Sequence, residues 1–564
     1  MLSSSRKRAV LLGIAGSYSA FSLSLYNLKA HAYRDPGARR RWDIEVLQHP
    51  LIDVAARAEK VAALADRIAA LRPTLVGFSC YLWNLEELRA LAVLLRRALP
   101  GVVLLWGGPE MTTDYVAAGK LDGDEIDLIV SGEGEQSFLE ILLALPEHPE
   151  ALASIAGLSY RRPGERAFTI NDKREPFPSL AHVPSPYLTG VVDDAVLHRP
   201  GVEANIETQR GCTLKCTYCI YHKDMSRIAY SGADRVLDEV MFVVNKGVRK
   251  IRFVDANFSS DLDHAKAVMR GLIVRHVEAK LTFELIPGFL DEELAALMGE
   301  YNALHPWNEI TLGVGVQTIN FGILRKMRRG ISVEKFEATF ALLEKYEIFA
   351  KIDLIIGLPG EDLRSIERTL EYMIERLRRS RAHLLCCHVM RGLPGTELLE
   401  QAIAHEMVFS SARDPHELIE SPALPRPDML KCLRRTAVVF RLINHGGWAR
   451  SDNIEINALN TAVGDEHVAA PVGSASIRDA FFAARDRLGI SNVALCDLLV
   501  EGLMKHLAPR GSWFALADFP HAETWWWSRA RDEVSDEWLC GFLDGLSPAH
   551  RAPASGREMA EVVS

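Results

Sequence analysis

The chain has 564 residues, of which 48% are hydrophobic and 25% are charged. This length predicts about three to four domains, and the composition is typical of a globular protein rather than a disordered, collagen-like or membrane-embedded chain. The net charge of −9 provides no overall basic field, so we expect no nucleic-acid partner and no membrane partner. Nine cysteines without framework spacing argue against a secreted disulfide scaffold and favour a reducing, cytoplasmic location.

Short apolar runs alternate with amphipathic helical patterns over residues 1–145. This alternation predicts an α/β fold with a doubly wound, Rossmann-like parallel sheet. The first run, Ala9 to Ile14, follows a basic triplet and is open to reading as a signal peptide, but a buried first strand is favoured. The expected strands are residues 9–14, 44–47, 75–79, 102–106 and 126–130.

Ligands of doubly wound sheets bind beyond the carboxyl ends of the strands. Three of the four segments at these ends are rich in Gly, Ser or Glu. A single glycine there reads as a tight turn, whereas glycines at successive strand ends favour a bound ligand. The candidate binding residues are Ser17, Tyr18, Ser79, Gly107, Gly108, Glu110, Gly132, Glu133 and Gly134.

The rest of the chain divides into three parts. Residues 146–202 are rich in proline without a sustained period, so we expect a linker segment. A second alternation predicts a partial or full (β/α) barrel over residues 203–400. Residues 401–564 are mainly helical in pattern, and we expect a domain that covers the barrel mouth and helps to select the substrate. The expected barrel strands are residues 204–207, 250–254, 282–286, 309–316, 351–356 and 383–389.

Cys212, Cys216 and Cys219 lie within eight residues, directly after the first expected barrel strand. Three thiolates can hold an iron–sulfur cluster and leave one iron of a four-iron cube open to a ligand. A structural zinc site would need a fourth ligand, for which His222 is the nearby candidate. A redox pair of Cys216 and Cys219 would leave Cys212 without a role.

This CxxxCxxC segment, with Tyr218 before its third cysteine, resembles the signature of radical S-adenosylmethionine (SAM) enzymes. In that family the cysteines hold a 4Fe-4S cluster, which chelates SAM and cleaves it to methionine and a 5′-deoxyadenosyl radical. The resemblance therefore implies that the three cysteines are cluster ligands and that an electron donor such as flavodoxin or ferredoxin is a partner. It also implies SAM contacts from Tyr218, Asp255, Asn257, Glu284, Gln317, Ile356 and Gly357.

The first 145 residues resemble the cobalamin-binding domain that precedes the radical barrel in one large subclass. The matching pieces are Val76 to Ser79, Trp106 to Glu110 and Ser131 to Glu135. The resemblance implies that the strand-end residues named above bind cobalamin. The loop residues Tyr81, Leu82 and Trp83 would then pass beneath the corrin.

The motif Asp-x-His-x-x-Gly, whose histidine lies below cobalt in many cobalamin domains, occurs nowhere in the chain. The loop that contains Tyr81, Leu82 and Trp83 holds no histidine either. We therefore expect its bulky side chains to block the lower face of cobalt rather than to ligate the metal.

The two resemblances together imply a cobalamin-dependent radical SAM methyltransferase. Its substrate would be an unactivated carbon of a small metabolite or of a peptide residue in natural-product biosynthesis. Cobalamin would take a methyl group from one SAM, and the radical from a second SAM would remove hydrogen from the substrate. Two alternatives stay open: a radical ring rearrangement or cyclisation without methyl transfer, and a cobalamin- or redox-sensing binding protein.

Overall fold

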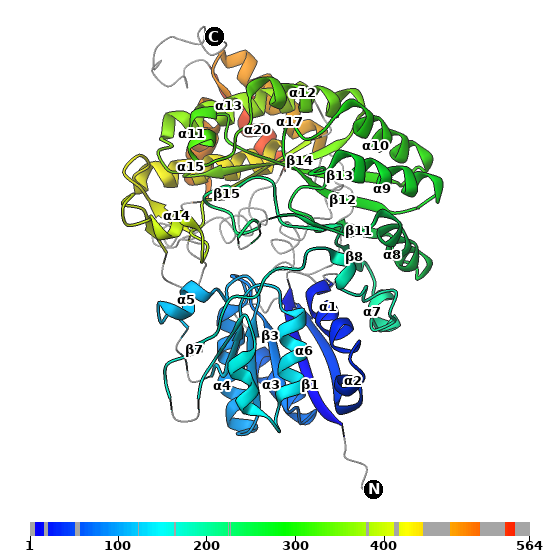
Figure 1. The fold of residues 1–564 in the computed structure, drawn as a ribbon. Helices are drawn as coiled ribbons and strands as arrows, with labels where there is room; N and C mark the ends of the chain where they lie inside the picture. The colour runs from blue at the N-terminus through cyan, green and yellow to red at the C-terminus, as the bar shows by residue number, and fades with distance from the viewer. Residues whose placement is uncertain are drawn as a thin grey trace.

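The computed structural model describes residues 6–15, 21–50, 57–121, 123, 125–162, 165–223, 225, 227–379, 383–410, 417–443, 474–507 and 536–547. Two sheets organise these residues, one in the N-terminal part and one in the middle of the chain. In Figure 1 the N-terminal sheet lies below the second sheet, and β1 (Lys7–Ala15) runs from the N-terminus toward it. The carboxyl ends of the N-terminal strands therefore face the second sheet.

The N-terminal sheet has the strand order β2-β1-β3-β4-β5-β6-β7. Its first five strands pair in parallel, which confirms the predicted fold class. The other strands of this sheet are β2 (Trp42–Pro50), β3 (Leu75–Ser79), β4 (Val103–Gly107), β5 (Leu128–Val130), β6 (Leu158–Tyr160) and β7 (Thr169–Ile170). Its helices are α1 (Leu23–Ala32), α2 (Pro36–Arg41), α3 (Arg57–Ala70), α4 (Leu85–Ala98), α5 (Thr113–Ala117) and α6 (Glu135–Ala144).

The segment expected to be a linker also contributes to the N-terminal sheet. β6 and β7 come from this segment and extend the sheet in antiparallel fashion. Strands of two and three residues are too short to produce a period in the sequence, which explains why they were not predicted. The segment further holds the 3-10 helices η2 (Pro149–Ser154) and η3 (Leu180–His182) and the helix α7 (Asp194–Leu197).

The second sheet is a partial barrel of parallel strands in the order β15-β14-β13-β12-β11-β8. Neighbours in the sheet are successive barrel strands in the chain, as the sequence predicts. The strands are β8 (Glu203–Ile206), β11 (Lys250–Phe253), β12 (Lys280–Leu285), β13 (Glu309–Gln317), β14 (Phe349–Ile356) and β15 (His383–Val389). The helices are α8 (Ala233–Asn245), α9 (Leu262–Val274), α10 (Glu292–Leu304), α11 (Phe321–Lys326), α12 (Val333–Lys345), α13 (Leu363–Arg379) and α14 (Glu397–Glu400).

Two short hairpins accompany the barrel. β9 (Gln209–Arg210) pairs with β10 (Ala229–Tyr230). The segment between these two strands contains Cys212, Cys216 and Cys219. β16 (Val408–Phe409) pairs with β17 (Leu418–Glu420) beyond the last barrel strand.

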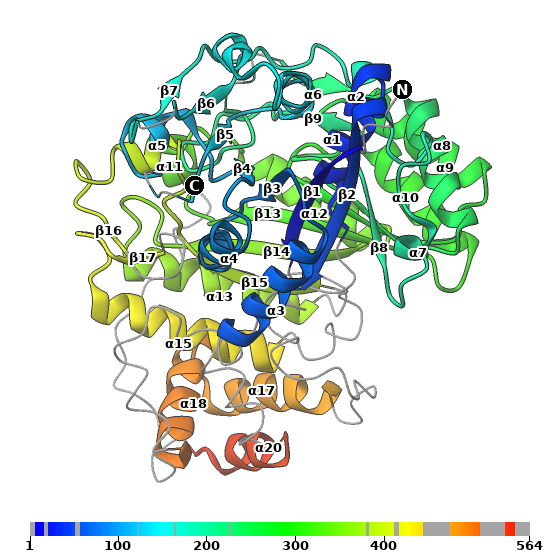
Figure 2. The same cartoon turned by 90° about the horizontal axis from the view of Figure 1, so that it is seen from below.

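The C-terminal helices are α15 (Arg426–Ile443), α17 (Ser474–Leu488), α18 (Asn492–Leu507) and α20 (Asp536–Gly545). They form a group beside α13, on one flank of the barrel (Figure 2). A single apolar core joins them to the barrel, with Leu377, Phe481 and Leu543 all fully buried in it. Residues 444–473 and 508–535 lie outside the described part of the chain, and a role of the C-terminal region at the barrel mouth stays a prediction.

Within the described residues, we find no helix whose length and apolar character would let it span a membrane.

Candidate functional site

The three cysteines lie in the loop between β9 and β10, next to the carboxyl end of β8. Cys216 is 4% exposed, and Cys212 and Cys219 are partly buried. Each sulfur meets a hydrogen-bond donor: a backbone amide at Cys212, another at Cys219, and Nη1 of Arg329 at 3.8 Å from Sγ of Cys216. Donors of this kind stabilise cysteine sulfurs that carry negative charge.

Burial in this loop disfavours free thiolates. Burial raises the pKa of Cys212, and it raises the pKa of Cys219 to about 11. Arg329 is a buried cation beside the sulfurs and opposes this effect. Nε of Arg329 is one of several buried polar atoms that lack a hydrogen-bond partner among the described residues. A thiol-lined site with an unsatisfied polar atom fits a 4Fe-4S cluster and its ligand.

His222 is not positioned as a fourth ligand to the three thiols. Its Nε2 atom lies 3.0 Å from the carbonyl oxygen of Cys216, so the ring contacts the backbone of the loop. No group of three or more His, Cys, Asp and Glu side chains in the described ranges is arranged for a single metal ion. This geometry gives no support to the zinc alternative.

The inner face of β13 carries two glycines followed by a glutamine. A Cβ atom at Gly313 would lie 2.3 Å from the carboxylate of Glu284, and one at Gly315 would lie 2.8 Å from Nη2 of Arg329 and from Nε2 of Gln317. The glycines thus leave room for three polar side chains above the strand. An acidic, a basic and an amide group close together suit a small zwitterionic ligand.

Gln317 ends β13 in a left-handed backbone conformation, with φ of 69°. The pairing of β13 with β14 shifts its register between Gly315 and Gln317. A non-glycine residue at positive φ beside a β-bulge costs free energy and often marks a functional site.

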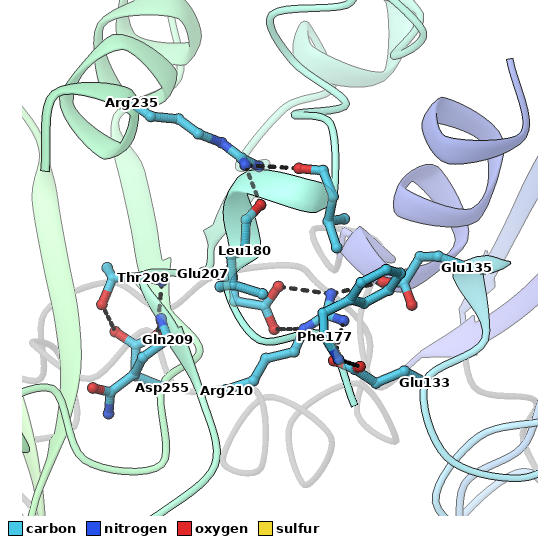
Figure 3. Close-up of polar contacts among 11 residues, drawn as sticks. Glu133, Glu135, Phe177, Leu180, Glu207, Thr208, Gln209, Arg210, Arg235 and Asp255 are labelled. Carbon is cyan, nitrogen blue, oxygen red and sulfur yellow. Dashed lines mark hydrogen bonds and ion pairs between the residues drawn. The ribbon is translucent and has the colours of Figure 1, made fainter. Parts of the chain in front are cut away.

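Asp255 holds the loop that leads to the cysteines, and Asn257 holds the backbone just after β12. Both oxygens of Asp255 accept hydrogen bonds, from the amides of Thr208 and Gln209 and from the Thr208 hydroxyl (Figure 3). Burial raises the pKa of Asp255 to about 7, although these hydrogen bonds act to lower it. Oδ1 of Asn257 accepts from the amide of Ile286 at 3.0 Å. Both side chains therefore brace the backbone, and the SAM contacts expected from Asp255 and Asn257 stay predictions.

The alternation of β14 places Ile356 on the outer face of the barrel. Its side chain is 2% exposed and belongs to the apolar core, while Ile355 takes the inner, partly exposed position. A Cβ atom at Gly357 would lie 2.5 Å from the Leu418 side chain, which covers this glycine. At this level the inward-facing side chain is that of Ile355, because alternation along a strand decides which side chains face inward. The SAM contacts expected from Ile356 and Gly357 stay predictions.

At the carboxyl edge of the N-terminal sheet, Tyr81 and Trp83 stack with ring centroids 4.5 Å apart. Trp83 is 43% exposed, while Leu82 is partly buried and Ser79 is 8% exposed. An exposed aromatic stack offers a flat apolar surface to a large planar ligand. The predicted contacts Ser17 and Tyr18 lie outside the described residues.

The turn that follows β4 requires glycine, because its backbone passes close to the loop after β3. Gly107 ends that strand, and Gly108 has φ of 116°. A Cβ atom at Gly108 would lie 2.5 Å from the carbonyl oxygen of Cys80. Glu110, two residues later, is 4% exposed, and burial raises its pKa to about 7.

After β5, the glycines shape the backbone of the turn, and Glu133 binds other parts of the protein. Gly132 has φ of 82°, and a Cβ atom there would meet no other atom within 4 Å, while Gly134 begins α6 as its N-cap. Glu133, in contrast, pairs with Arg210 of the barrel part and accepts from the amide of Phe177 (Figure 3). The protein partners of the Glu133 carboxylate are therefore Arg210 and Phe177, and the cobalamin contact expected from Glu133 stays a prediction.

Sequence reasoning missed a polar group inside the barrel. Oδ1 of Asp353 lies 3.0 Å from Nε2 of His388 and 3.3 Å from Nζ of Lys351. Asp353 pairs in register with Gly315, so this group lies at the level of the glycine-lined strand. It was missed because the residues are separated in sequence and match no motif.

Two family models match the chain. The radical SAM superfamily matches residues 206–373, and the B12 binding domain matches residues 38–142. The first range contains the three cysteines, and the second contains the aromatic stack and the glycines after β4.

Curated proteins with related sequences include two methyltransferases. TokK of Streptomyces tokunonensis, a cobalamin-dependent radical SAM methyltransferase, is 28% identical over 66% of this chain and 54% of its own length. The 2-(S-pantetheinyl)-carbapenam-3-carboxylate methyltransferase of Streptantibioticus cattleyicolor is 26% identical over 62% of this chain and 50% of its own length. The chain thus spans about half the length of these relatives.

Solved structures share the fold. The cobalamin-dependent radical enzyme OxsB matches with a TM-score of 0.62 at 14% identity, over 96% of this chain and 78% of its own. The methyltransferase TsrM from Kitasatospora setae matches with a TM-score of 0.56 at 20% identity, over 72% and 79%. The chain thus carries a region similar to the B12 binding domain, followed by a region similar to the radical SAM superfamily.

Proposed function

We propose that this protein is a cobalamin-dependent radical SAM methyltransferase that methylates an unactivated carbon. The observation that carries the proposal is the cysteine loop, in which each of the three sulfurs meets its own hydrogen-bond donor beside a glycine-lined strand. The names of the two curated relatives support methyl transfer, and one of them acts on a carbapenam carboxylate. A small metabolite, or a residue of a peptide, is therefore the proposed substrate.

We assign Cys212, Cys216 and Cys219 as the three cluster ligands. When bound, the cluster and cobalamin supply one-electron cleavage of SAM and the transport of a methyl group. The protein holds the thiolates in a buried loop and places Arg329 next to them as a permanent cation. This cation offsets part of the negative charge that three thiolates bring into a poorly solvated site.

Glu284, Gln317 and Arg329 are the proposed contacts of the methionine part of SAM. Together they offer a carboxylate for an ammonium group and donors for a carboxylate. Gly313 and Gly315 keep the floor of this region free of side chains. Asp255 supports the arrangement indirectly, because it fixes the loop that leads to the cysteines, and Asn257 fixes the backbone just after β12.

Cobalamin would lie on the carboxyl edge of the N-terminal sheet. The Tyr81–Trp83 stack and the turns at Gly108 and Gly132 are the proposed contacts. This edge faces the barrel, so a cofactor there would lie between the two sheets (Figure 1). An enclosed position of this kind limits the access of water to a reactive intermediate.

The substrate would enter the barrel beside Asp353 and His388. Their contact places a carboxylate and an imidazole on the inner wall, where the substrate needs polar partners for orientation. We infer that this group positions the substrate, since hydrogen-atom abstraction itself requires no acid or base. A reductant such as flavodoxin or ferredoxin remains the proposed electron donor.

The test uses anaerobically reconstituted protein with SAM that is isotopically labelled in its methyl group. The proposal expects 5′-deoxyadenosine to form under reducing conditions and the label to appear in the protein-bound cobalamin fraction. Formation of 5′-deoxyadenosine without methyl label on cobalamin would instead favour a rearrangement or cyclisation. Protein that binds both cofactors but cleaves no SAM would point to a sensor and overturn the proposal.

A further inference from the structure

Arg210 is buried between the two parts of the molecule and contacts three carboxylates (Figure 3). Its Nη1 atom lies 2.8 Å from Glu133, and its Nη2 atom lies 2.7 Å from Glu135. Its Nε and Nη2 atoms bind both oxygens of Glu207, at 2.8 and 2.9 Å. All the polar hydrogens of a guanidinium point in fixed directions, so these contacts define one relative placement of their partners.

The partners belong to different parts of the chain. Glu133 and Glu135 follow β5 in the N-terminal sheet, whereas Glu207 follows β8 in the barrel. The side chains of Arg210, Glu133 and Glu135 are 12%, 8% and 6% exposed. Such burial makes the network costly to open, because one ion removed from it leaves its partner charged and poorly solvated.

Both ends of this network lead to a proposed cofactor. Arg210 is separated from Cys212 by a single residue, and the neighbouring Thr208 and Gln209 are fixed by Asp255. On the other side, the two glutamates alternate with Gly132 and Gly134 in the loop proposed to contact cobalamin. The guanidinium therefore ties the cluster loop to the cobalamin loop through very few intervening bonds.

We propose that Arg210 is a positioning residue that sets the separation and orientation of the cobalamin and the iron–sulfur cluster. This inference rests on the proposed function, because it requires both cofactors. A methyl carrier and a radical generator must reach the same substrate carbon, and small errors in placement lower the rate of such reactions strongly. Arg210 touches neither reacting atom and acts through the two loops that it joins.

A more exposed ion pair between the same two parts provides a matched control. Lys223 of the barrel part contacts Asp114 of α5 at 2.5 Å, but Asp114 is 49% exposed. Exposed pairs contribute little to stability or placement. The Asp114→Asn variant thus removes an interdomain ion pair without disturbing the buried network.

The experiment measures the magnetic interaction between cobalt(II) and the reduced cluster in the full-length, doubly loaded protein, without substrate. Wild type should show one narrow distance distribution by pulsed electron paramagnetic resonance, and Asp114→Asn should match it. Arg210→Lys should retain its iron and cobalamin content yet lose the single narrow distance, because lysine cannot bind three carboxylates in a fixed plane. A merely structural role would lower cofactor content and leave the distance of the loaded fraction unchanged.

Glu135→Gln serves as a second variant if Arg210→Lys does not fold, since it removes one charge and keeps the shape of the side chain. The inference is overturned if both foldable variants keep the narrow distance of wild type. Wild-type protein that takes up no cobalamin, or forms no cluster, would contradict the proposed function instead. The two failures are therefore distinguishable.

Discussion

The carboxyl edges of the two sheets face each other but are built differently. The barrel edge is dense in polar side chains: buried thiols, a buried arginine and carboxylates that already accept hydrogen bonds. The edge of the N-terminal sheet offers turns at positive φ, the stack of Tyr81 on the exposed Trp83, and buried carboxyl groups at Glu110 and at Glu135, which pairs with Arg210. The first edge therefore suits a ligand that is recognised by charge and coordination, and the second suits a ligand that is recognised by shape and apolar area.

This difference follows from what each edge must hold. A charged, reactive ligand requires groups fixed in advance, since reorganising polar groups in a buried site is costly. A large planar cofactor gains most of its binding free energy from buried surface, and glycines let the backbone approach it. Four predictions test the contrast, from the largest expected effect to the smallest.

The strongest test of the barrel edge removes its sulfurs. Replacing Cys212, Cys216 and Cys219 together by alanine should abolish iron binding, the charge-transfer absorbance and the formation of 5′-deoxyadenosine, because these thiolates are the proposed ligands. Iron analysis and absorbance after anaerobic reconstitution measure the effect. Cys540→Ala, in α20, should keep both signals. Iron retained by the triple variant would contradict the assignment.

The second prediction fills the space above β13. Gly315→Val should weaken SAM binding about 100-fold, or ~3 kcal/mol, because its side chain displaces Arg329 and Gln317. The cluster should still assemble, so the change in its paramagnetic spectrum on SAM addition reports the affinity. Gly232→Ala is the control, since a Cβ atom there meets nothing within 4 Å. Unchanged affinity in Gly315→Val would show that SAM does not use this region.

The third prediction concerns Glu110 at the edge of the N-terminal sheet. Burial raises its pKa from 4.5 to about 7, so the folded state retains a proton that the unfolded state has lost between these values. The protonated Glu110 side chain makes its full contribution to the free energy of unfolding below pH 4.5. This contribution is lost as the pH rises through about 7. Glu110→Gln should thus be more stable than wild type at pH 8, by about 2 kcal/mol.

Thermal unfolding of the apoprotein at pH 4.5 and pH 8 measures this effect. The difference between Glu110→Gln and wild type should vanish at the lower pH, and the exposed Glu59→Gln variant should show no difference at either. Adding cobalamin should reduce the difference at pH 8 if the cofactor supplies Glu110 with a partner. A stability difference between Glu110→Gln and wild type that grows at low pH would contradict the predicted direction of the pKa shift of Glu110.

The smallest effect is spectroscopic. The loop from Ser79 to Asn84 contains no histidine, and its stacked Tyr81 and Trp83 favour a blocked lower face of cobalt. The cobalt(II) form should therefore show no nitrogen superhyperfine splitting in its electron paramagnetic resonance spectrum. Triplet splitting would mean that a nitrogen ligand reaches cobalt from elsewhere in the chain.

The sequence by itself determined the order of the elements and the position of the cysteine loop. Apolar periodicity is a local property, and every predicted barrel strand overlaps an observed one within a few residues. The spacing of Cys212, Cys216 and Cys219 is equally local, so it indicated a cluster without any knowledge of the fold. The two-residue strand β7 produced no such signal and was missed.

Only the tertiary structure decided which side chains meet. Arg329 reaches Cys216 across 113 residues, and Arg210 reaches Glu133 across 77. It also decided that Ile355 rather than Ile356 faces the barrel interior, and that Asp255 braces a backbone loop. These outcomes depend on strand parity and on how two separately folded sheets dock, and neither is encoded in a short stretch of sequence.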